Sequence, residues 1–146
     1  HRQRLRITAM GLLKIFDVAG SAMAAQSMRL NITASNLANA DSVSGDPRKV
    51  YRARHPVFAV QAFDRDQGDT STGVRMLGVV ESRGAPAVRY EPNNPLADAQ
   101  GRIYASSVNS VEEMANMLSA SRSYQSSLAV LETSRDLILR TLSLGR

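Results

Sequence analysis

The sequence lacks cysteine and tryptophan and contains few aromatic residues of any kind. None of its 146 residues is Cys or Trp, and aromatic residues make up 5% of the chain. Without cysteine there is no disulfide, no thiolate zinc site and no cysteine nucleophile. Because large rings dominate most compact cores, this chain must bury mainly Leu, Val, Met and Ala, which favours helix packed on helix.

Histidine is also scarce, which limits the catalytic arrangements available to the chain. The two histidines are His1 and His55, and neither lies in a G-x-S-x-G or an H-E-x-x-H pattern. His55 precedes a proline in an arginine-rich segment, where an exposed strand residue is the simpler interpretation. We therefore expect no enzyme activity.

One acidic segment resembles the start of a calcium-binding loop. Asp64, Asp66 and Asp69 alternate with other residues, as the first ligands of such a loop do. The bidentate Glu that the loop requires would have to be Arg75, so the pattern fails. We expect a solvated loop here, and neither a metal site nor a cofactor elsewhere in the chain.

The net charge of +5 is not organised as a nucleic-acid site. Three arginines lie in residues 1–9, which contain no acidic residue. Residues 10–40 hold only Lys14 and Arg29 as basic residues, against Asp17. A basic, nucleic-acid-associated coiled-coil protein is the alternative from a different class, and it requires positive charge concentrated on one helix face. The sequence therefore predicts no nucleic-acid partner.

The beginning of the chain carries no recognisable targeting signal. Residues 1–9 contain no apolar run of the length found in secretory signals. No continuous run approaches the roughly 18 apolar residues of a membrane span. We interpret residues 1–9 as an N-terminal appendage and expect no direct membrane insertion.

Residues 10–41 are predicted to form the N-terminal helix of an assembly core. Apolar residues recur in steps of three and four from Leu12 to Leu37, and a second apolar stripe lies beside them. This period is typical of a helix with a broad apolar face. Seven alanines between Ala19 and Ala40 keep the helix slim, so that another backbone can approach it closely.

Residues 42–107 have a different composition and are predicted to form a β-rich insert. They contain all five prolines and show no helical period. Turn-rich pieces separate four β-like runs, and so few short strands are not expected to be very stable alone. The four runs are Val50 to Arg54, Val57 to Phe63, Val74 to Glu81 and Ala87 to Tyr90.

Residues 108–146 show the clearest pattern and are predicted to form the C-terminal helix of the assembly core. Nine positions alternate steps of three and four, and seven of them are apolar. A sustained period of 3.5 residues indicates packing against another helix as a coiled coil. Ser110 and Glu113 fit a capping box at the start of the helix. The nine positions are Met114, Met117, Ser121, Tyr124, Leu128, Leu131, Arg135, Ile138 and Leu142.

The predicted fold is α+β and mainly α, with the two terminal helices paired as a coiled coil and a small irregular β insert between them. The helices lie at opposite ends of the chain, so they pair only if the insert folds back as a long connection. This arrangement is unusual for a compact enzyme. It suits a structural subunit whose helices are completed by neighbouring chains.

The first helix closes on a polar segment, Ser35 to Asp41. It contains two asparagines and a serine, which are mediocre helix formers because their side chains compete for the backbone. Either the helix frays here with Asn39 near its cap, or the polar side chains bond sideways to a neighbouring chain and fix the register. The residues alone leave both interpretations open.

Two segments of the chain resemble a known family. The run S-N-L-A-N at Ser35–Asn39, after an Ala- and Gln-rich amphipathic helix, resembles the signature of the flagellar rod and hook family of bacterial axial proteins. The residues of Val108–Gln125 resemble the C-terminal helix of that family, and the run N-P-L-A-D at Asn94–Asp98 and the short length resemble its proximal-rod members. Distal-rod and hook members usually continue with Thr-x-Gly-Tyr. This chain instead reads S-V-S-G-D at Ser42–Asp46, which favours the proximal rod.

The resemblance implies a structural subunit of the proximal rod of the bacterial flagellar basal body. Such a subunit polymerises into a helical tube in the periplasm, transmits motor torque and encloses the export channel. It would be exported by the flagellar type III apparatus without a cleaved signal peptide. The implied partners are copies of itself, other proximal rod subunits, the adjoining distal rod proteins, the membrane-ring base and the export apparatus. Another rod or hook subunit is the alternative within the family.

The expected assembly interface has two parts, both predicted to stay uncovered until adjacent chains assemble. The first part matches the motifs of the family: Ser35, Asn36, Leu37, Asn39, Glu113, Met114, Met117, Arg122, Tyr124 and Gln125. The second part continues the apolar pattern of the C-terminal helix: Leu128, Leu131, Ile138 and Leu142.

Overall fold

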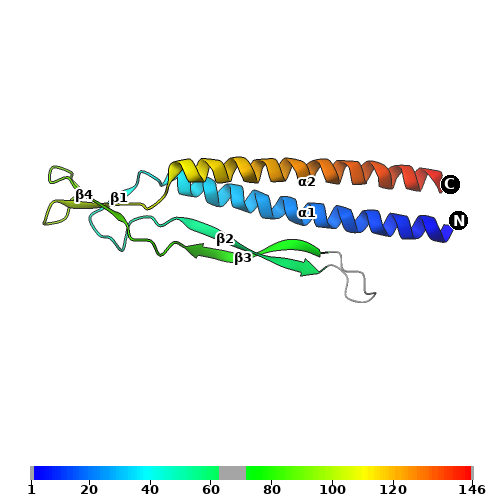
Figure 1. Cartoon of the computed structure of the whole chain (residues 1–146), viewed down its shortest axis with the longest axis horizontal. Helices are drawn as coiled ribbons and strands as arrows, with labels where there is room; N and C mark the ends of the chain where they lie inside the picture. Colours follow the sequence, from blue (N-terminus) through cyan, green and yellow to red (C-terminus); the bar gives the residue numbers. More distant parts are fainter. Residues whose placement is uncertain (1, 63–71, 146) are drawn as a thin grey trace. The chain divides into compact units, whose positions relative to one another are not determined.

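The computed structural model describes residues 2–62 and 72–145, and two long helices dominate it (Figure 1). Helix α1 spans Arg2–Ala38 and helix α2 spans Ser110–Leu144, with 37 and 35 residues. Short strands lie between them, so the predicted α+β, mainly α fold is confirmed. The strands are β1 (Val43–Ser44), β2 (Arg54–Ala62), β3 (Thr72–Glu81), β4 (Ala87–Tyr90) and β5 (Arg102–Ala105).

Helix α1 begins earlier and ends slightly earlier than the sequence pattern suggested. It starts at Arg2, so residues 2–9, interpreted as an appendage, are helical. After Ala38 the backbone N–H and the side-chain amide of Asn39 both donate to the carbonyl oxygen of Ser35, at 3.2 and 2.8 Å. Asn39 therefore satisfies a carbonyl of the last turn, which the end of a helix otherwise leaves without a partner. That residues 1–9 form an appendage outside the assembly core stays a prediction.

Helix α2 begins at an asparagine cap. Oδ1 of Asn109 accepts hydrogen bonds from the backbone N–H groups of Val111 and Glu112, at 3.1 and 3.2 Å. Asn109 is therefore the N-cap, and the predicted capping box of Ser110 and Glu113 is wrong. Glu113 is buried and its side chain bonds elsewhere. The acidic first turn of α2 still suits the positive end of the helix dipole.

The predicted strands fare unevenly. Ala87–Tyr90 coincides with β4, and the predicted run from Val74 lies within β3. The predicted strand from Val50 is wrong, because residues 50–53 are irregular and β2 begins only at Arg54. The alternation of Arg52 and Arg54 with Tyr51 and Ala53 suggested a strand, although residues 51–53 have no regular secondary structure.

Some of the predicted segments fall partly or wholly outside the described residues. The predicted run from Val57 to Phe63 lies within β2 as far as Ala62. The last residue of that run, Phe63, is outside the described residues. The predicted loop around Asp64, Asp66 and Asp69 lies wholly outside. β1 and β5 were not predicted at all, because strands of two and four residues are too short to show a period.

A three-stranded antiparallel sheet has β5 at its centre, in the order β1-β5-β4. Val43 pairs with Ala105 on one side, and Ala87 pairs with the same residue on the other. Ile103 of β5 is 1% exposed and is the largest fully buried apolar side chain of the described residues. The turn between β4 and β5 needs Gly101, whose φ of +74° is open to glycine at little cost. The two remaining strands, β2 and β3, form a separate two-stranded sheet.

The chain divides into two compact units. The helical unit contains residues 2–28, 58–62, 72–77 and 120–145 of the described chain, and the sheet unit contains Arg29–Val57 and Gly78–Ser119. Each unit includes part of α1 and part of α2. In the helical unit the two helix segments lie side by side and run in opposite directions (Figure 1).

Small residues line the buried seam of the helical unit. Among its described residues, every buried one is alanine, serine or glycine. Small side chains let two helix backbones approach closely, but each buries little apolar area. The large apolar side chains described in this unit are therefore at most half-buried. The buried residues are Ala19, Ala25, Gly73, Ala120 and Ser134.

Candidate assembly interface

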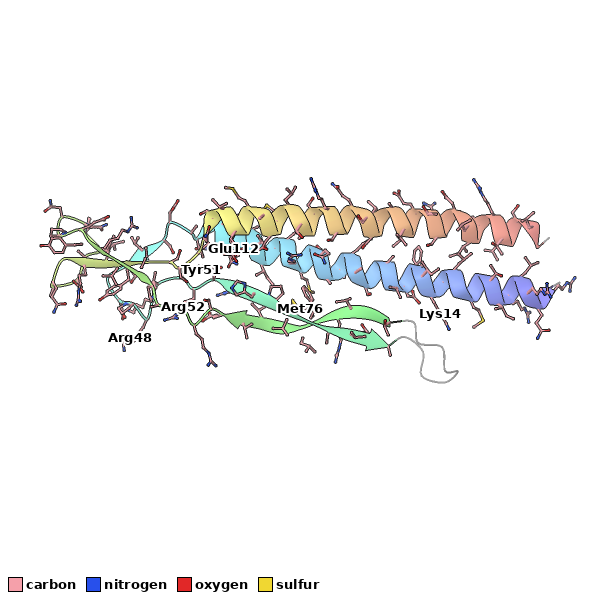
Figure 2. All side chains as sticks on the ribbon, in the orientation of Figure 1. Lys14, Arg48, Tyr51, Arg52, Met76 and Glu112 are labelled. Atoms are coloured by element: carbon pink, nitrogen blue, oxygen red, sulfur yellow. The ribbon has the colours of Figure 1, made fainter. Side chains whose placement is uncertain are left out.

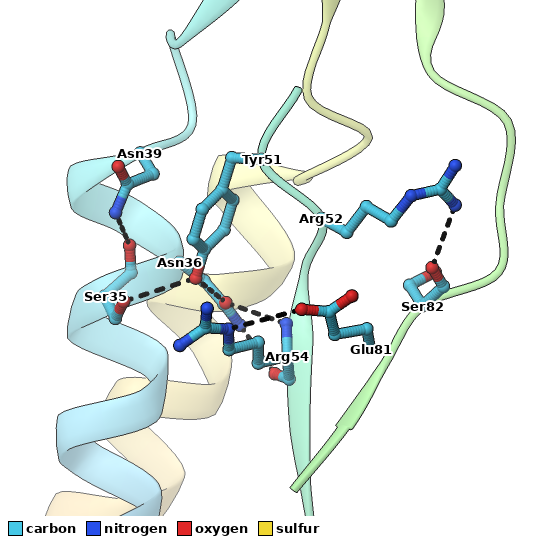
Figure 3. A network of polar contacts seen from close by, with 8 residues as sticks. All are labelled: Ser35, Asn36, Asn39, Tyr51, Arg52, Arg54, Glu81 and Ser82. Carbon is cyan, nitrogen blue, oxygen red and sulfur yellow. Dashed lines mark hydrogen bonds and ion pairs between the residues drawn. The ribbon is translucent and has the colours of Figure 1, made fainter. Parts of the chain in front are cut away.

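A cluster of polar side chains in the sheet unit surrounds Asn36, which is 1% exposed. We call Ser35, Asn36, Tyr51, Arg54 and Glu113 the Asn36 cluster. It joins the end of α1, the chain leading into β2 and the start of α2, three segments far apart in the sequence. Figure 3 shows the side of the cluster formed by α1 and β2.

The side chain of Asn36 uses its full hydrogen-bonding capacity within the chain. Nδ2 donates to the carbonyl oxygen of Arg54 (2.8 Å) and to Oε2 of Glu113 (3.1 Å). Oδ1 accepts from the backbone N–H of Arg54 (2.9 Å) and from the hydroxyl of Tyr51 (2.7 Å). Two donors and two acceptor sites are all that an amide side chain has. The sequence could not show that these partners lie in the same chain.

The other contacts made by the neighbours of Asn36 are longer. The hydroxyls of Ser35 and Tyr51 lie 3.2 Å apart, and Arg54 forms an exposed ion pair with Glu81 at 3.9 Å (Figure 3). Asn39 bonds only within its own helix end. The structure thus gives the two asparagines of the motif different surroundings, and their predicted contacts to a neighbouring chain stay predictions.

The predicted seam of α2 lies only partly on its buried side. Met117, Tyr124, Leu131 and Ile138 are half-buried, as are Leu128 and Ser121. Buried Glu113, Ala120 and Ser134 occupy positions one residue before the predicted Met114, Ser121 and Arg135. Other residues predicted for the seam or the interface face outward: Met114 and Leu142 are about three-fifths exposed, and Arg122, Gln125 and Arg135 are also exposed. A seven-residue period indicates that one side of the helix packs against another helix. Which residues face inward depends on the tertiary packing.

An apolar stripe on α2 remains uncovered in the helical unit. Val130, Leu137 and Leu144 repeat every seven residues and are 47%, 43% and 80% exposed. Residues at this spacing lie on the same side of a helix. Figure 2 shows side chains projecting outward along both helices. Sequence reasoning did not single out this stripe, although its seven-residue spacing is readable in the sequence.

A groove between the two helices adjoins the stripe. It has a volume of about 290 Å³, and mostly small and apolar side chains line it. Val130 belongs to both the groove and the stripe. The groove therefore extends the uncovered apolar surface onto α1. Its lining residues are Ile15, Val18, Ala19, Ala22, Ser126, Ser127 and Val130.

Helix α1 also carries exposed apolar side chains, including Ile7, Met10, Leu13 and Ile15. An 18-residue window of α1 has a mean hydropathy of 1.4, so by length and composition alone this helix could cross a membrane. The search for a continuous apolar run missed it, because polar residues interrupt the window. The expectation of no membrane insertion stays a prediction.

No cluster of three or more metal-ligating side chains occurs within residues 2–62 and 72–145. His55 is exposed on β2, as expected. Among the described residues, two carboxyl groups have a lowered pKa, and each accepts a hydrogen bond from the backbone N–H two residues further along the chain. A hydrogen bond from the Arg48 side chain lowers the pKa of Asp46, and one from the Arg102 backbone N–H lowers that of Asp98.

Two paired helices with uncovered apolar surfaces define a structural subunit that is built for assembly. Two family models match the chain: "Flagella basal body rod protein" over residues 16–45, and "Flagellar basal body rod FlgEFG protein C-terminal" over residues 99–144. These matches fall on α1 with the residues that follow it, and on β5 with α2.

Similar proteins extend the match over nearly the whole chain. The flagellar basal-body rod protein FlgC of Salmonella typhimurium is 52% identical over 137 residues, which cover 94% of this chain and all of the relative. FlgC of Escherichia coli O157:H7 is 51% identical and that of Yersinia enterocolitica 47%, over the same shares. The chain belongs to the FlgC family of flagellar basal-body rod proteins. It is a structural rod subunit of the flagellar basal body, where it assembles with other rod components.

Proposed function

We propose that this subunit builds the proximal rod by polymerising through α1 and α2 into a helical tube in the periplasm. The tube would transmit motor torque and enclose the export channel, and its subunits would be exported by the type III apparatus without a cleaved signal peptide. Its neighbours would be copies of itself, other proximal rod subunits, distal rod proteins, the membrane-ring base and the export apparatus. The proposal assigns the chain no enzyme activity and no nucleic-acid partner.

The uncovered apolar stripe of α2 carries this proposal. Covering a Leu or Val side chain contributes about 1.5–3 kcal/mol, whereas ordering one residue costs about 1–2 kcal/mol. In the helical unit the fully buried residues are small and larger apolar side chains such as Leu128 and Leu131 are only half-buried, so pairing α1 with α2 covers only part of the apolar surface. Contacts with neighbouring subunits add the missing apolar burial, which couples the folding of these helices to assembly.

We infer that a helix of a neighbouring subunit covers the groove and the stripe together. Val130 links the two surfaces, and Leu137 and Leu144 continue along α2. Of the predicted interface residues, exposed Met114, Arg122, Gln125 and Leu142 are free to contact neighbours directly. Half-buried Ser35, Leu37, Asn39, Met117, Tyr124, Leu128, Leu131 and Ile138 have less surface to offer, and Asn36 and Glu113 are buried within the chain.

Leu137→Asp tests the proposal, with Ser143→Asp as its matched control. Both changes put a carboxylate on an exposed position near the end of α2, but Ser143 lies about 120° around the helix from Leu137 and outside the apolar stripe. We expect Leu137→Asp to abolish motility and to remove the subunit from purified basal bodies, while Ser143→Asp retains both. Export of the variant into the medium is measured alongside, so that a failure of export is told apart from a failure of assembly. Normal assembly of Leu137→Asp would contradict the proposal.

A further inference from the structure

At the start of α2 a charged side chain is buried and the apolar side chain next to it is exposed. Glu113 is 4% exposed, whereas the next residue, Met114, is 61% exposed. Adjacent residues of a helix point about 100° apart, so a rotation of the start of α2 by about this angle would bury the methionine and release the glutamate. Apolar burial alone favours that other orientation, because a carboxylate is costly to bury and a thioether is not.

The Asn36 cluster supplies the interaction that opposes this rotation. The amide of Asn36 donates to the Glu113 carboxylate at 3.1 Å, and its other bonds fix it to the backbone of Arg54 and to Tyr51. Because every donor and acceptor of this amide is used, Asn36 is held in one orientation and offers Glu113 a single position. A charge-assisted bond of this kind is stronger than one between neutral groups.

Polar residues occupy the most buried positions of the helix segments in the sheet unit, and large apolar residues such as Leu37 and Met117 are only half-buried there. The buried residues of its helix segments are Thr33, Asn36 and Glu113, all of them polar. A buried polar residue is the best-attested device for fixing the register of paired helices, because a shifted pairing leaves it without partners.

We infer that the Asn36–Glu113 bond sets the rotation and register of α2 against α1 in the sheet unit, and so holds Met114 outward. Val111 and Leu118 lie on the same exposed side of α2 as Met114. The bond thus selects which apolar side chains α2 presents. This effect of the bond occurs within one chain and does not depend on the proposed function. Only its consequence for rod assembly rests on that function.

Thiol labelling measures the rotation directly, because the chain contains no cysteine of its own. The probe is Met114→Cys, reacted with a maleimide in the otherwise unchanged full-length chain. A separate chain with Val50→Cys, at a buried position of the sheet unit, reports whether that unit is folded. We expect fast labelling at position 114 and slow labelling at position 50. Fast labelling at both positions would show that the cluster does not hold the unit together, and would overturn the inference.

Two variants remove the bond in different ways. Glu113→Ala removes the acceptor, and Asn36→Leu removes the donor. In both we expect position 114 to label severalfold more slowly, because α2 turns to bury it. If the bond only stabilised the folded unit, its loss would unfold that unit. The thiol at position 114 would then label at the same rate or faster. Unchanged or faster labelling in both variants would therefore overturn the inference.

Two conservative variants complete the test. Glu113→Gln keeps an oxygen that can accept from Asn36, so it should restore fast labelling at position 114. Asn39→Asp alters the other asparagine of the motif, whose side-chain amide donates to the carbonyl oxygen of Ser35 and not to α2, and should leave the rate unchanged. Slow labelling in Glu113→Gln, or an equal effect of Asn39→Asp, would show that the hydrogen bond to Asn36 does not set the rotation.

Discussion

The two units of this chain differ in what they bury. The sheet unit buries Ile103 and Val50 and fully satisfies Asn36, so its own residues supply both apolar burial and polar order. The described part of the helical unit buries only alanine, serine and glycine, while Leu137 and Leu144 remain exposed. The residues of the first unit therefore cover its own core, whereas those of the second leave large apolar side chains exposed. The two regions of this short chain differ in how much of their apolar surface they bury themselves.

The largest expected effect concerns the core of the sheet unit. Ile103→Ala removes its most buried apolar side chain and should lower the free energy of unfolding by about 2–5 kcal/mol. Val88→Ala, in the neighbouring strand β4 but more than half exposed, is the control and should cost within about 0.5 kcal/mol. Urea unfolding followed by tyrosine fluorescence measures both. Equal losses in the two variants would mean that the sheet unit has no core of its own.

A second substitution tests the close approach of the helices. Ala120 is fully buried, so Ala120→Leu has no space for its added carbons and should cost about 1–3 kcal/mol in the assembled rod. Ala129→Leu, exposed on the same helix, is the control and should be neutral or favourable. The thermal stability of isolated basal bodies compares the two. If both variants assemble equally stable rods, the seam of small residues is not closely packed.

The smallest effect concerns acid sensitivity of the β4–β5 turn in the sheet unit. Oδ1 of Asp98 accepts from the backbone N–H groups of Gln100 (2.9 Å) and Arg102 (2.8 Å), and the bond from Arg102 is the main cause of its lowered pKa. A carboxyl with a lowered folded pKa stabilises the turn fully above its ordinary value of 3.8, and this contribution is lost as the pH falls through the folded value.

Amide exchange of Gln100 and Arg102 reports this loss without requiring global unfolding. The two amides should lose protection below about pH 4 after correction for intrinsic exchange rates. In Asp98→Asn their protection should not depend on pH over that range. The same acid-dependent loss in the Asn variant would assign the effect to another group.

The sequence supported the overall architecture well and the details of the site poorly. Helical periods in α1 and α2 span tens of residues, so local propensity and apolar spacing were enough to place both helices. β1 and β5 were missed because each is too short to show a period, and β5 carries Ile103 at the centre of its sheet. The irregular segment from Val50 to Ala53 was predicted as part of a strand because Arg52 and Arg54 alternate with Tyr51, Ala53 and His55.

The sequence by itself determined the two terminal helices, the insert between them and the family motifs, because each depends on residues that are close together along the chain. Only the tertiary structure decided which side of α2 faces inward. The stepping pattern placed Met114 in the seam, whereas the structure buries the adjacent Glu113 and leaves Met114 exposed. The choice was made by Asn36, 77 positions away from Glu113, whose amide is held by the backbone of β2 and bonds the carboxylate. No spacing within a helix can encode such a partner, because the bond exists only after distant segments have met.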